Sequence, residues 1–225
     1  MKRLADDYTT KTRISHNPKI KSMIPGRSRI LTCPFCGEKK VVMTVLSGNT
    51  FGAEYWSDNK MIAPMPPEVS YIQKCPHCKK YYITARQEMK MADNGFSMET
   101  GTLTFPEMKE AFAQLSGGGF QEEKEEVIVR WMLHHAYNDH HYRGEHKVDA
   151  NKEDRMLFKN NAIWLITNSI SDNLLKAEFY REIGEYDVAY DLLKSVEVET
   201  DFQKVILSDI QKRVESKDCE VFKIK

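Results

Sequence analysis

The chain has 225 residues, 41% of them hydrophobic, which is enough to form one large domain or two small ones with a real core. Its 33 basic and 33 acidic residues leave no net charge, which excludes a global field that would steer the whole molecule toward nucleic acid or anionic lipid. No stretch approaches the roughly 20 apolar residues of a membrane span, and the start lacks the apolar middle of a secretory signal. We therefore expect a cytoplasmic protein that does not enter a membrane.

Residues 1–28 are predicted to form a basic arm without a core of its own, because their apolar residues show no periodicity. Residues 1–32 carry eight basic side chains against two acidic ones, which gives a local net charge of +6. Such a charge favours nucleic-acid binding by this segment even though the whole chain is neutral.

Residues 29–90 are predicted to form a small β domain. Strand-like runs occur at 41–46 and 81–84, and residues typical of turns separate them. The segment 47–49, Ser-Gly-Asn, suits a tight turn with positive φ. The aromatic residues that follow are interpreted as packing residues that add apolar mass to a small domain; they are Phe51, Tyr55 and Trp56.

Two C-P-x-C motifs lie in this β domain. The proline presets φ in a tight turn, and two intervening residues allow both thiolates of a motif to reach one ion. In a reducing cytosol such paired cysteines are metal ligands rather than disulfides. Four protein ligands leave no open position, so we expect one structural Zn²⁺ and not a catalytic ion. The predicted ligands are Cys33, Cys36, Cys75 and Cys78.

Two other interpretations of the motifs are weaker. A thioredoxin-like redox pair needs a single C-x-x-C motif at the start of a helix, and neither motif here is followed by a helical sequence. His77 lies inside the second motif and is interpreted as a loop residue, not as a fifth ligand. The 38 residues between the motifs exceed the usual ribbon spacing of about 15–20, which predicts an insertion in one arm.

The segment between the motifs has a distinctive order. It begins SGNTFGA at 47–53, continues with WSD at 56–58, and reaches the second motif through a proline-rich run. In this order the region 31–85 resembles a group of uncharacterised bacterial zinc-ribbon proteins. The resemblance implies zinc and a ribbon fold, and it implies no reaction. Lys79 departs from the pattern, since glycine often follows the closing motif.

Residues 104–218 are predicted to form an all-α domain. Pro106 suits a first helical turn, and the glycines 117–119 separate the first helix from the second. The second helix, 122–142, is apolar on nearly all sides and should be buried. Its acidic start, 122–126, is interpreted as a solvated turn that complements the helix dipole. Further helices are expected at 153–170, 172–183, 185–197 and 201–217.

The helix pair at 172–197 resembles a tetratricopeptide repeat, in which small residues let two helices approach and a glycine opens the turn between them. The residues that carry the resemblance are Ala177, Tyr180, Gly184, Tyr186, Ala189 and Leu193. A single repeat cannot bury its own face, so this pair must stack on neighbouring helices. The predicted fold class is thus α+β: a small β zinc ribbon followed by an all-α helical array with one tetratricopeptide-like helix pair.

Five histidines fall within thirteen residues: His134, His135, His140, His141 and His146. None of the pairs has the i, i+4 spacing that lets one helix chelate an ion. We interpret them as packed or solvent-facing residues, with a second metal site as the alternative.

Three functions are compatible with these features. The favoured one is a non-enzymatic scaffold that binds a protein or peptide through the helical array. The second is nucleic-acid binding through the basic arm and the lysines around the motifs, which are Lys39, Lys40, Lys74, Lys79 and Lys80. The third is a metal-dependent enzyme that uses the His134–His146 segment. No catalytic residue is assigned, and Cys219 lacks an activating neighbour in sequence.

Overall fold

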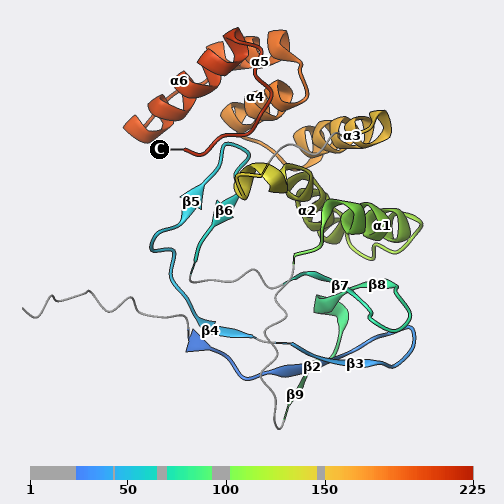
Figure 1. The fold of residues 1–225 in the computed structure, drawn as a ribbon. Coiled ribbons are helices and arrows are strands. Elements are labelled where there is room, and N and C mark those ends of the chain that lie inside the picture. The colour runs from blue at the N-terminus through green and yellow to red at the C-terminus, as the bar shows by residue number, and fades with distance from the viewer. Residues whose placement is uncertain (1–23, 43, 65–69, 93–101, 146–149, 225) are drawn as a thin grey trace, which may run out of the picture.

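The fold is described from a computed structural model covering residues 24–42, 44–64, 70–92, 102–145 and 150–224. All but the last five residues of the predicted arm at 1–28 lie outside this description. The described residues form six α-helices and several small antiparallel sheets, which confirms a mixed fold of helices and strands (Figure 1). None of the described helices is long and apolar enough to cross a bilayer.

Short strands pair into separate antiparallel sheets. β2 (Arg29–Thr32) lies between β3 (Lys39–Val42) and β9 (Lys90–Met91), and β7 (Ile72–Lys74) pairs with β8 (Tyr81–Ile83). β1 (Ile24–Pro25) pairs with β4 (Val45–Ser47), and β5 (Glu54–Tyr55) with β6 (Met61–Ile62). The prediction of one continuous strand at 41–46 is wrong, because Thr44 bonds to the backbone of Gly26 and Arg27 and the run divides between β3 and β4.

The segment between β4 and β5 also differs from expectation. The positive φ predicted at 47–49 occurs instead at Gly52, with φ 76°, in a turn closed by the Ala53 N–H and the Thr50 carbonyl at 2.9 Å. Phe51 does not pack, since 87% of its surface is exposed. Trp56 does pack, edge-on against Tyr142 with ring centroids 5.1 Å apart.

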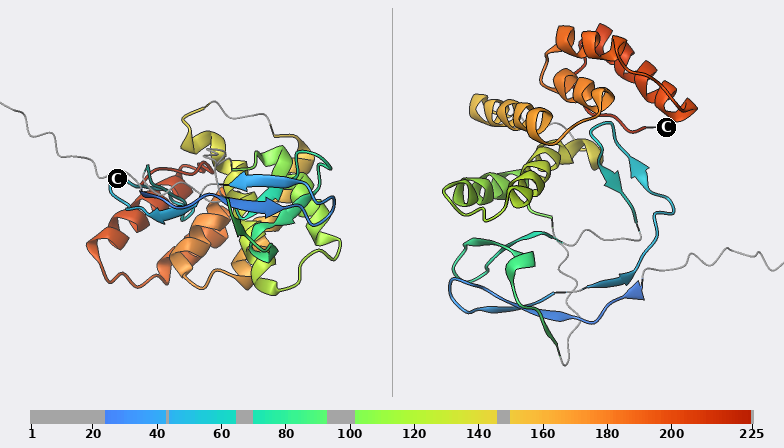
Figure 2. Two further views of the ribbon diagram at one scale, coloured as in Figure 1. Left: turned by 90° about the horizontal axis from the view of Figure 1, so that it is seen from below. Right: turned by 180° about the vertical axis from the view of Figure 1, so that it is seen from behind.

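The helices follow one another in a curved stack (Figures 1 and 2). They are α1 (Phe105–Ser116), α2 (Glu123–Tyr142), α3 (Lys152–Asn168), α4 (Asn173–Glu182), α5 (Tyr186–Lys194) and α6 (Asp201–Glu215). Their starts agree with the predicted ones because the sequence supplies capping side chains, for example Asp172 before α4 and Thr200 before α6. The turn between α4 and α5 needs glycine, because Gly184 has φ 80°.

The hairpin of β7 and β8 shares a hydrophobic core with the first two helices. Ile72, Tyr81 and Ile83 from the hairpin are almost completely buried against side chains of α1 and α2. Those helical partners are Met108, Ala111, Leu115, Val129 and Leu133. The second cysteine motif is therefore attached directly to the helical array.

The hairpin of β5 and β6 reaches the other end of the array (Figure 1). There it meets the C-terminal tail, since the Ser57 N–H donates to the Phe222 carbonyl at 2.9 Å and the Phe222 N–H donates to Ser57 Oγ at 3.1 Å. Phe222 itself packs into the core formed by α4, α5 and α6. Hairpin and tail together cover this part of the helical stack.

Candidate metal centre

Both cysteine motifs form six-residue loops that close antiparallel hairpins. Residues 33–38 join β2 to β3, and residues 75–80 join β7 to β8. In each loop the backbone N–H of the first cysteine donates a hydrogen bond to the carbonyl of the last loop residue. The distance is 2.8 Å for Cys33 and 2.9 Å for Cys75. The carbonyl of the same cysteine accepts a hydrogen bond from the backbone N–H of the fifth loop residue, at 3.0 Å in both loops. The two sequence motifs thus produce one local structure twice.

The fifth position of each loop is left-handed. Gly37 has φ 75° and Lys79 has φ 62°. A side chain in this region is strained by its Cβ, which explains the glycine in the first loop. Lys79 adopts the same left-handed conformation although it carries a Cβ. The presence of lysine in place of glycine therefore does not change the shape of the second loop.

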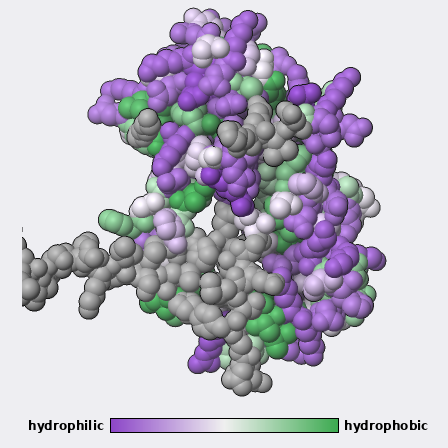
Figure 3. All heavy atoms as spheres, viewed as in Figure 1, coloured by the Kyte–Doolittle hydropathy of each residue, from purple (hydrophilic) through white to green (hydrophobic). Residues whose placement is uncertain are grey.

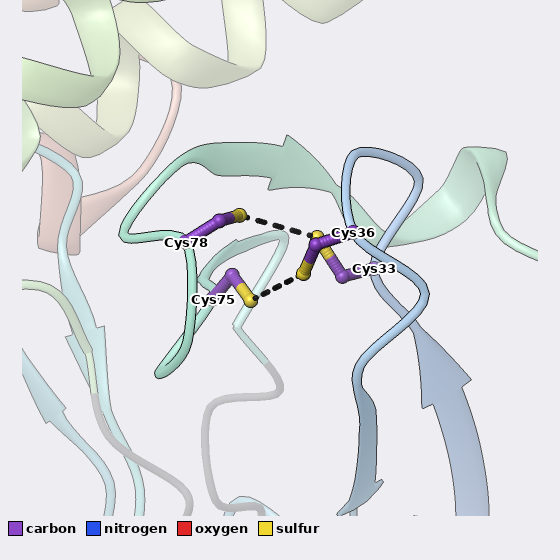
Figure 4. Close-up of side chains that lie close together, drawn as sticks. All are labelled: Cys33, Cys36, Cys75 and Cys78. Atoms are coloured by element: carbon purple, nitrogen blue, oxygen red, sulfur yellow. Dashed lines mark hydrogen bonds between the residues drawn. The ribbon is translucent and has the colours of Figure 1, made fainter.

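The four sulfurs converge between the two loops (Figure 4). Cys33 Sγ lies 3.7 Å from Cys78 Sγ, and Cys36 Sγ lies 3.6 Å from Cys75 Sγ. All four sulfurs lie within 4.8 Å of one another. A disulfide would bring two sulfurs to about 2.0 Å, whereas a sulfur tetrahedron around Zn²⁺ at about 2.3 Å has edges of about 3.8 Å. The arrangement fits four separate ligands of one metal ion.

The electrostatics of the site also favour a cation. Burial opposes ionisation of Cys75, but the backbone N–H groups of Cys78 and His77 lower the pKa of its thiol to about 6. The Glu38 N–H lowers the pKa of Cys36, yet desolvation and the neighbouring thiols raise it to about 12. Ionisation of Cys75 therefore opposes ionisation of Cys36 unless a positive charge lies between them. A divalent cation would supply that charge.

Among the described residues, no side chain outside the two motifs adds a ligand to this cluster. His77 is exposed and is not part of the sulfur cluster, as its interpretation as a loop residue expects. Two of the lysines near the motifs contact other side chains. Lys74 forms ion pairs with Glu107 at 3.6 Å and Glu110 at 3.3 Å, and Nζ of Lys80 lies 4.9 Å from the centre of the Phe35 ring.

The acidic start of α2 is not simply solvated, which corrects the sequence interpretation. Glu125 is buried, and its Oε1 accepts a hydrogen bond from Nε of Arg86 at 2.6 Å. It also accepts the backbone N–H groups of Gln121 and Glu122 at 2.7 and 3.3 Å, and so closes a capping box. The partner was not foreseeable locally, because Arg86 lies 39 residues earlier.

The histidines have different environments. His134 is completely buried, His135 is half-buried, and the rings of His140 and His141 lie 3.9 Å apart; His146 lies outside the described residues. Burial lowers the pKa of His134 to about 4, so this ring is neutral near pH 7.

The partners of His134 come from distant parts of the chain and are not among the predicted site residues. Ligand atoms of Asp58 and Glu182 lie within 4.8 Å of it and of each other, and both residues are buried. Asp58 belongs to the WSD segment, which offered a signal, whereas nothing in the sequence singles out Glu182.

No protein-family profile, curated protein or solved structure matches the chain, so its function has to be argued from these sites. Four clustered cysteines could hold a metal ion, and four protein ligands leave no coordination position for a substrate.

Proposed function

We propose that the protein is a non-enzymatic scaffold, stabilised by one structural Zn²⁺, whose helical array binds a segment of a partner protein. The metal ligands are Cys33, Cys36, Cys75 and Cys78. The observation that carries the binding role is an open, mainly apolar cavity of about 550 Å³ along α1 and α2, outside the cysteine centre. In this proposal the ion holds the two cysteine-bearing hairpins together, and the helices form the surface that binds the partner.

The choice of Zn²⁺ follows from the ligands. Thiolates are soft donors that select zinc, copper(I) or iron–sulfur clusters, and a closed tetrahedral set of four thiolates is typical of structural zinc. The spacing of 3.6 to 3.7 Å between paired sulfurs supports a single ion. Two hairpins whose loops face one another across that ion would form a zinc ribbon, with the segment 44–64 as its insertion.

The cavity has the character of a peptide-binding site. Its walls are apolar side chains: Tyr71, Leu103, Met108, Ile128, Trp131, Met132 and Ala136. Lys60, His135 and Asp139 add polar groups at its lining. Cavities of a few hundred Å³ with a few convergent polar groups are usual binding sites, and this volume accommodates a few apolar side chains of a peptide.

The rest of the array supports this location. The α4 and α5 pair, which we interpret as tetratricopeptide-like, buries Ala177 and Ala189 completely and stacks on α6. The surface next to this helix pair is already covered by Phe222 and by the β5 and β6 hairpin that bonds to it. A partner segment is thus better placed along α1 and α2. Figure 3 shows that hydrophilic residues otherwise predominate on the visible face of the helices.

The nucleic-acid alternative has less support among the described residues. Lys74 faces Glu107 and Glu110, so its charge is opposed, and Lys40 donates a hydrogen bond to Gln73 Oε1 at 3.3 Å. Nucleic-acid binding through the predicted arm at 1–28 would be detected as a gel shift that weakens steeply with salt.

Site-specific photo-crosslinking tests the scaffold proposal. A photoreactive residue at Ile128, in the cavity wall, should capture a discrete partner, whereas the same residue at Val205, exposed on α6, should not. The purified partner should then bind the wild-type chain, and Ile128→Glu should weaken that binding at least tenfold while Val205→Glu leaves it unchanged. Equal capture from both positions, or binding that Ile128→Glu does not affect, would contradict the proposal.

A further inference from the structure

A second group of ligand atoms lies in the interior and shares no residue with the cysteine cluster. Asp58 comes from the turn between β5 and β6, His134 from the middle of α2, and Glu182 from the last residue of α4. Their ligand atoms lie within 4.8 Å of one another, and none of the three residues has more than 6% of its surface exposed. The fold therefore brings three metal-ligating side chains together from three separate elements.

The His134 ring is held in one orientation. It lies between two phenyl rings, stacked on Phe179 at 4.2 Å between centroids and on Phe158 at 4.8 Å. In the described part of the chain, neither of its ring nitrogens has a hydrogen-bond partner. A buried imidazole without partners is costly, so the site needs an explanation.

The contact between His134 and Glu182 is not a hydrogen bond. Nε2 of His134 lies 3.1 Å from Oε2 of Glu182, but the geometry does not align a donor with an acceptor. The second oxygen, Oε1 of Glu182, is buried and has no partner among the described residues. Ligands of one ion have this relationship: their donor atoms approach one another while their lone pairs point at a common centre.

The two carboxylates are also oriented by neighbours. Nδ2 of Asn138 donates to Asp58 Oδ2 at 3.1 Å and to Glu182 Oε2 at 3.0 Å. The Tyr142 hydroxyl donates to Asp58 Oδ2, and the Lys60 N–H donates to Oδ1 at 3.2 Å. Hydrogen bonds of this kind fix the ligands of metal sites from the outside.

Two buried carboxylates this close repel each other unless a proton or a cation lies between them. The adjacent guanidinium of Arg181 donates to both oxygens of Glu178, at 2.8 and 2.5 Å, and therefore compensates that carboxylate. A divalent cation at the centre of the three residues would balance both Asp58 and Glu182 and use the lone pair of His134. It would satisfy two unpartnered atoms at once, one ring nitrogen of His134 and Oε1 of Glu182.

We propose that Asp58, His134 and Glu182 bind a second divalent cation. Two carboxylate oxygens and one imidazole nitrogen are ligands for Zn²⁺, Mn²⁺, Fe²⁺ or Co²⁺, whereas the four thiolates select a softer ion. The second ion would tie the β5 and β6 turn to α2 and α4. Glu182 and Asn138 also line a cavity of about 330 Å³, which gives an ion a route to the site.

Equilibrium dialysis of the zinc-loaded protein against Co²⁺ tests this site. The wild-type chain should retain two ions in total, counted as zinc plus cobalt. Cobalt held by oxygen and nitrogen gives weak absorption, whereas cobalt at the cysteines gives intense sulfur charge-transfer bands. We therefore expect about one Co²⁺ per chain without those bands, and a higher melting temperature when Co²⁺ is present.

The isosteric variants Asp58→Asn and Glu182→Gln provide the comparison. Each should retain one ion in total and bind Co²⁺ at least tenfold more weakly, with no rise in melting temperature on adding Co²⁺. Either variant suffices if the other fails to fold. The control is Glu215→Gln, which removes an exposed carboxylate on α6 and should keep both ions. One ion in the wild type, or equal retention by wild type and both carboxylate variants, would overturn the proposal.

Discussion

Arg86 and Glu125 join the second cysteine-bearing hairpin to the helical array through a two-pronged ion pair. Arg86 ends the 3₁₀ turn Thr84–Arg86 after β8, and Glu125 lies in the first turn of α2. Nε donates to Oε1 at 2.6 Å, while Nη2 donates to Oε2 and to the Gly119 carbonyl at 2.7 Å. The hydrogen bonds from Arg86 lower the pKa of Glu125 to about 2 despite its burial.

Replacing Glu125 by glutamine should destabilise the protein by about 2 to 3 kcal/mol at pH 7, because it leaves Arg86 without its counter-charge. Because the folded pKa lies below the ordinary value of 4.5, the carboxylate stabilises the fold fully above pH 4.5 and loses this effect as the pH falls toward 2. Urea unfolding at pH 7 and pH 3 should therefore show a smaller difference between wild type and variant at pH 3.

The matched control for this prediction is Glu123→Gln, which removes an exposed acid from the same helical turn. It should change the free energy of unfolding by no more than about 0.5 kcal/mol. A difference between wild type and Glu125→Gln that stays constant from pH 7 to pH 3 would contradict the role of the ion pair.

Lys79→Gly should stabilise the protein by up to about 1 kcal/mol, because the loop holds this residue at positive φ. The reciprocal change Gly37→Lys puts a side chain at the equivalent position of the first loop and should destabilise by about 1 kcal/mol. Chemical denaturation of the zinc-loaded proteins measures both. The idea of two equivalent loops is wrong if the two substitutions shift stability in the same direction.

Phe222→Ala should cost about 3 to 5 kcal/mol, because the ring is buried in the core of α4, α5 and α6. Since the backbone of Phe222 also bonds to Ser57, loss of the ring should loosen the β5 and β6 hairpin and increase its amide hydrogen exchange. Phe202→Ala, at a side chain that is 55% exposed on α6, should change stability by no more than about 0.5 kcal/mol. Similar effects of the two substitutions would show that the tail is not docked.

Local signals in the sequence predicted much of this fold. The helices after residue 104 begin and end close to the predicted positions, because their caps and glycines act within a few residues. The four cysteines were predicted to converge for a similar reason: each motif folds its own loop, and one ion needs four ligands. Local chemistry of this kind is readable without knowledge of the tertiary structure.

Contacts between distant segments could not be predicted in the same way. Asp58 and Glu182 approach His134 only after the β5 and β6 hairpin docks on the array, and no helical spacing encodes that event. The spacing of the histidines along α2 excludes a chelating pair on that helix, but spacing along one helix carries no information about partners from other elements. The division of the run at 41–46 likewise depends on Thr44 bonding across to Gly26 and Arg27.

X-ray absorption at the zinc edge tests the central claim most directly. The Glu182→Gln variant, loaded with one equivalent of zinc, should show four sulfur neighbours at about 2.3 Å, because the only ion is then held by Cys33, Cys36, Cys75 and Cys78. Cys75→Ser should lose that shell, and Cys219→Ser, which changes an exposed cysteine outside the cluster, should retain it. Zinc surrounded mainly by nitrogen and oxygen, or a protein that binds no zinc, would contradict the account.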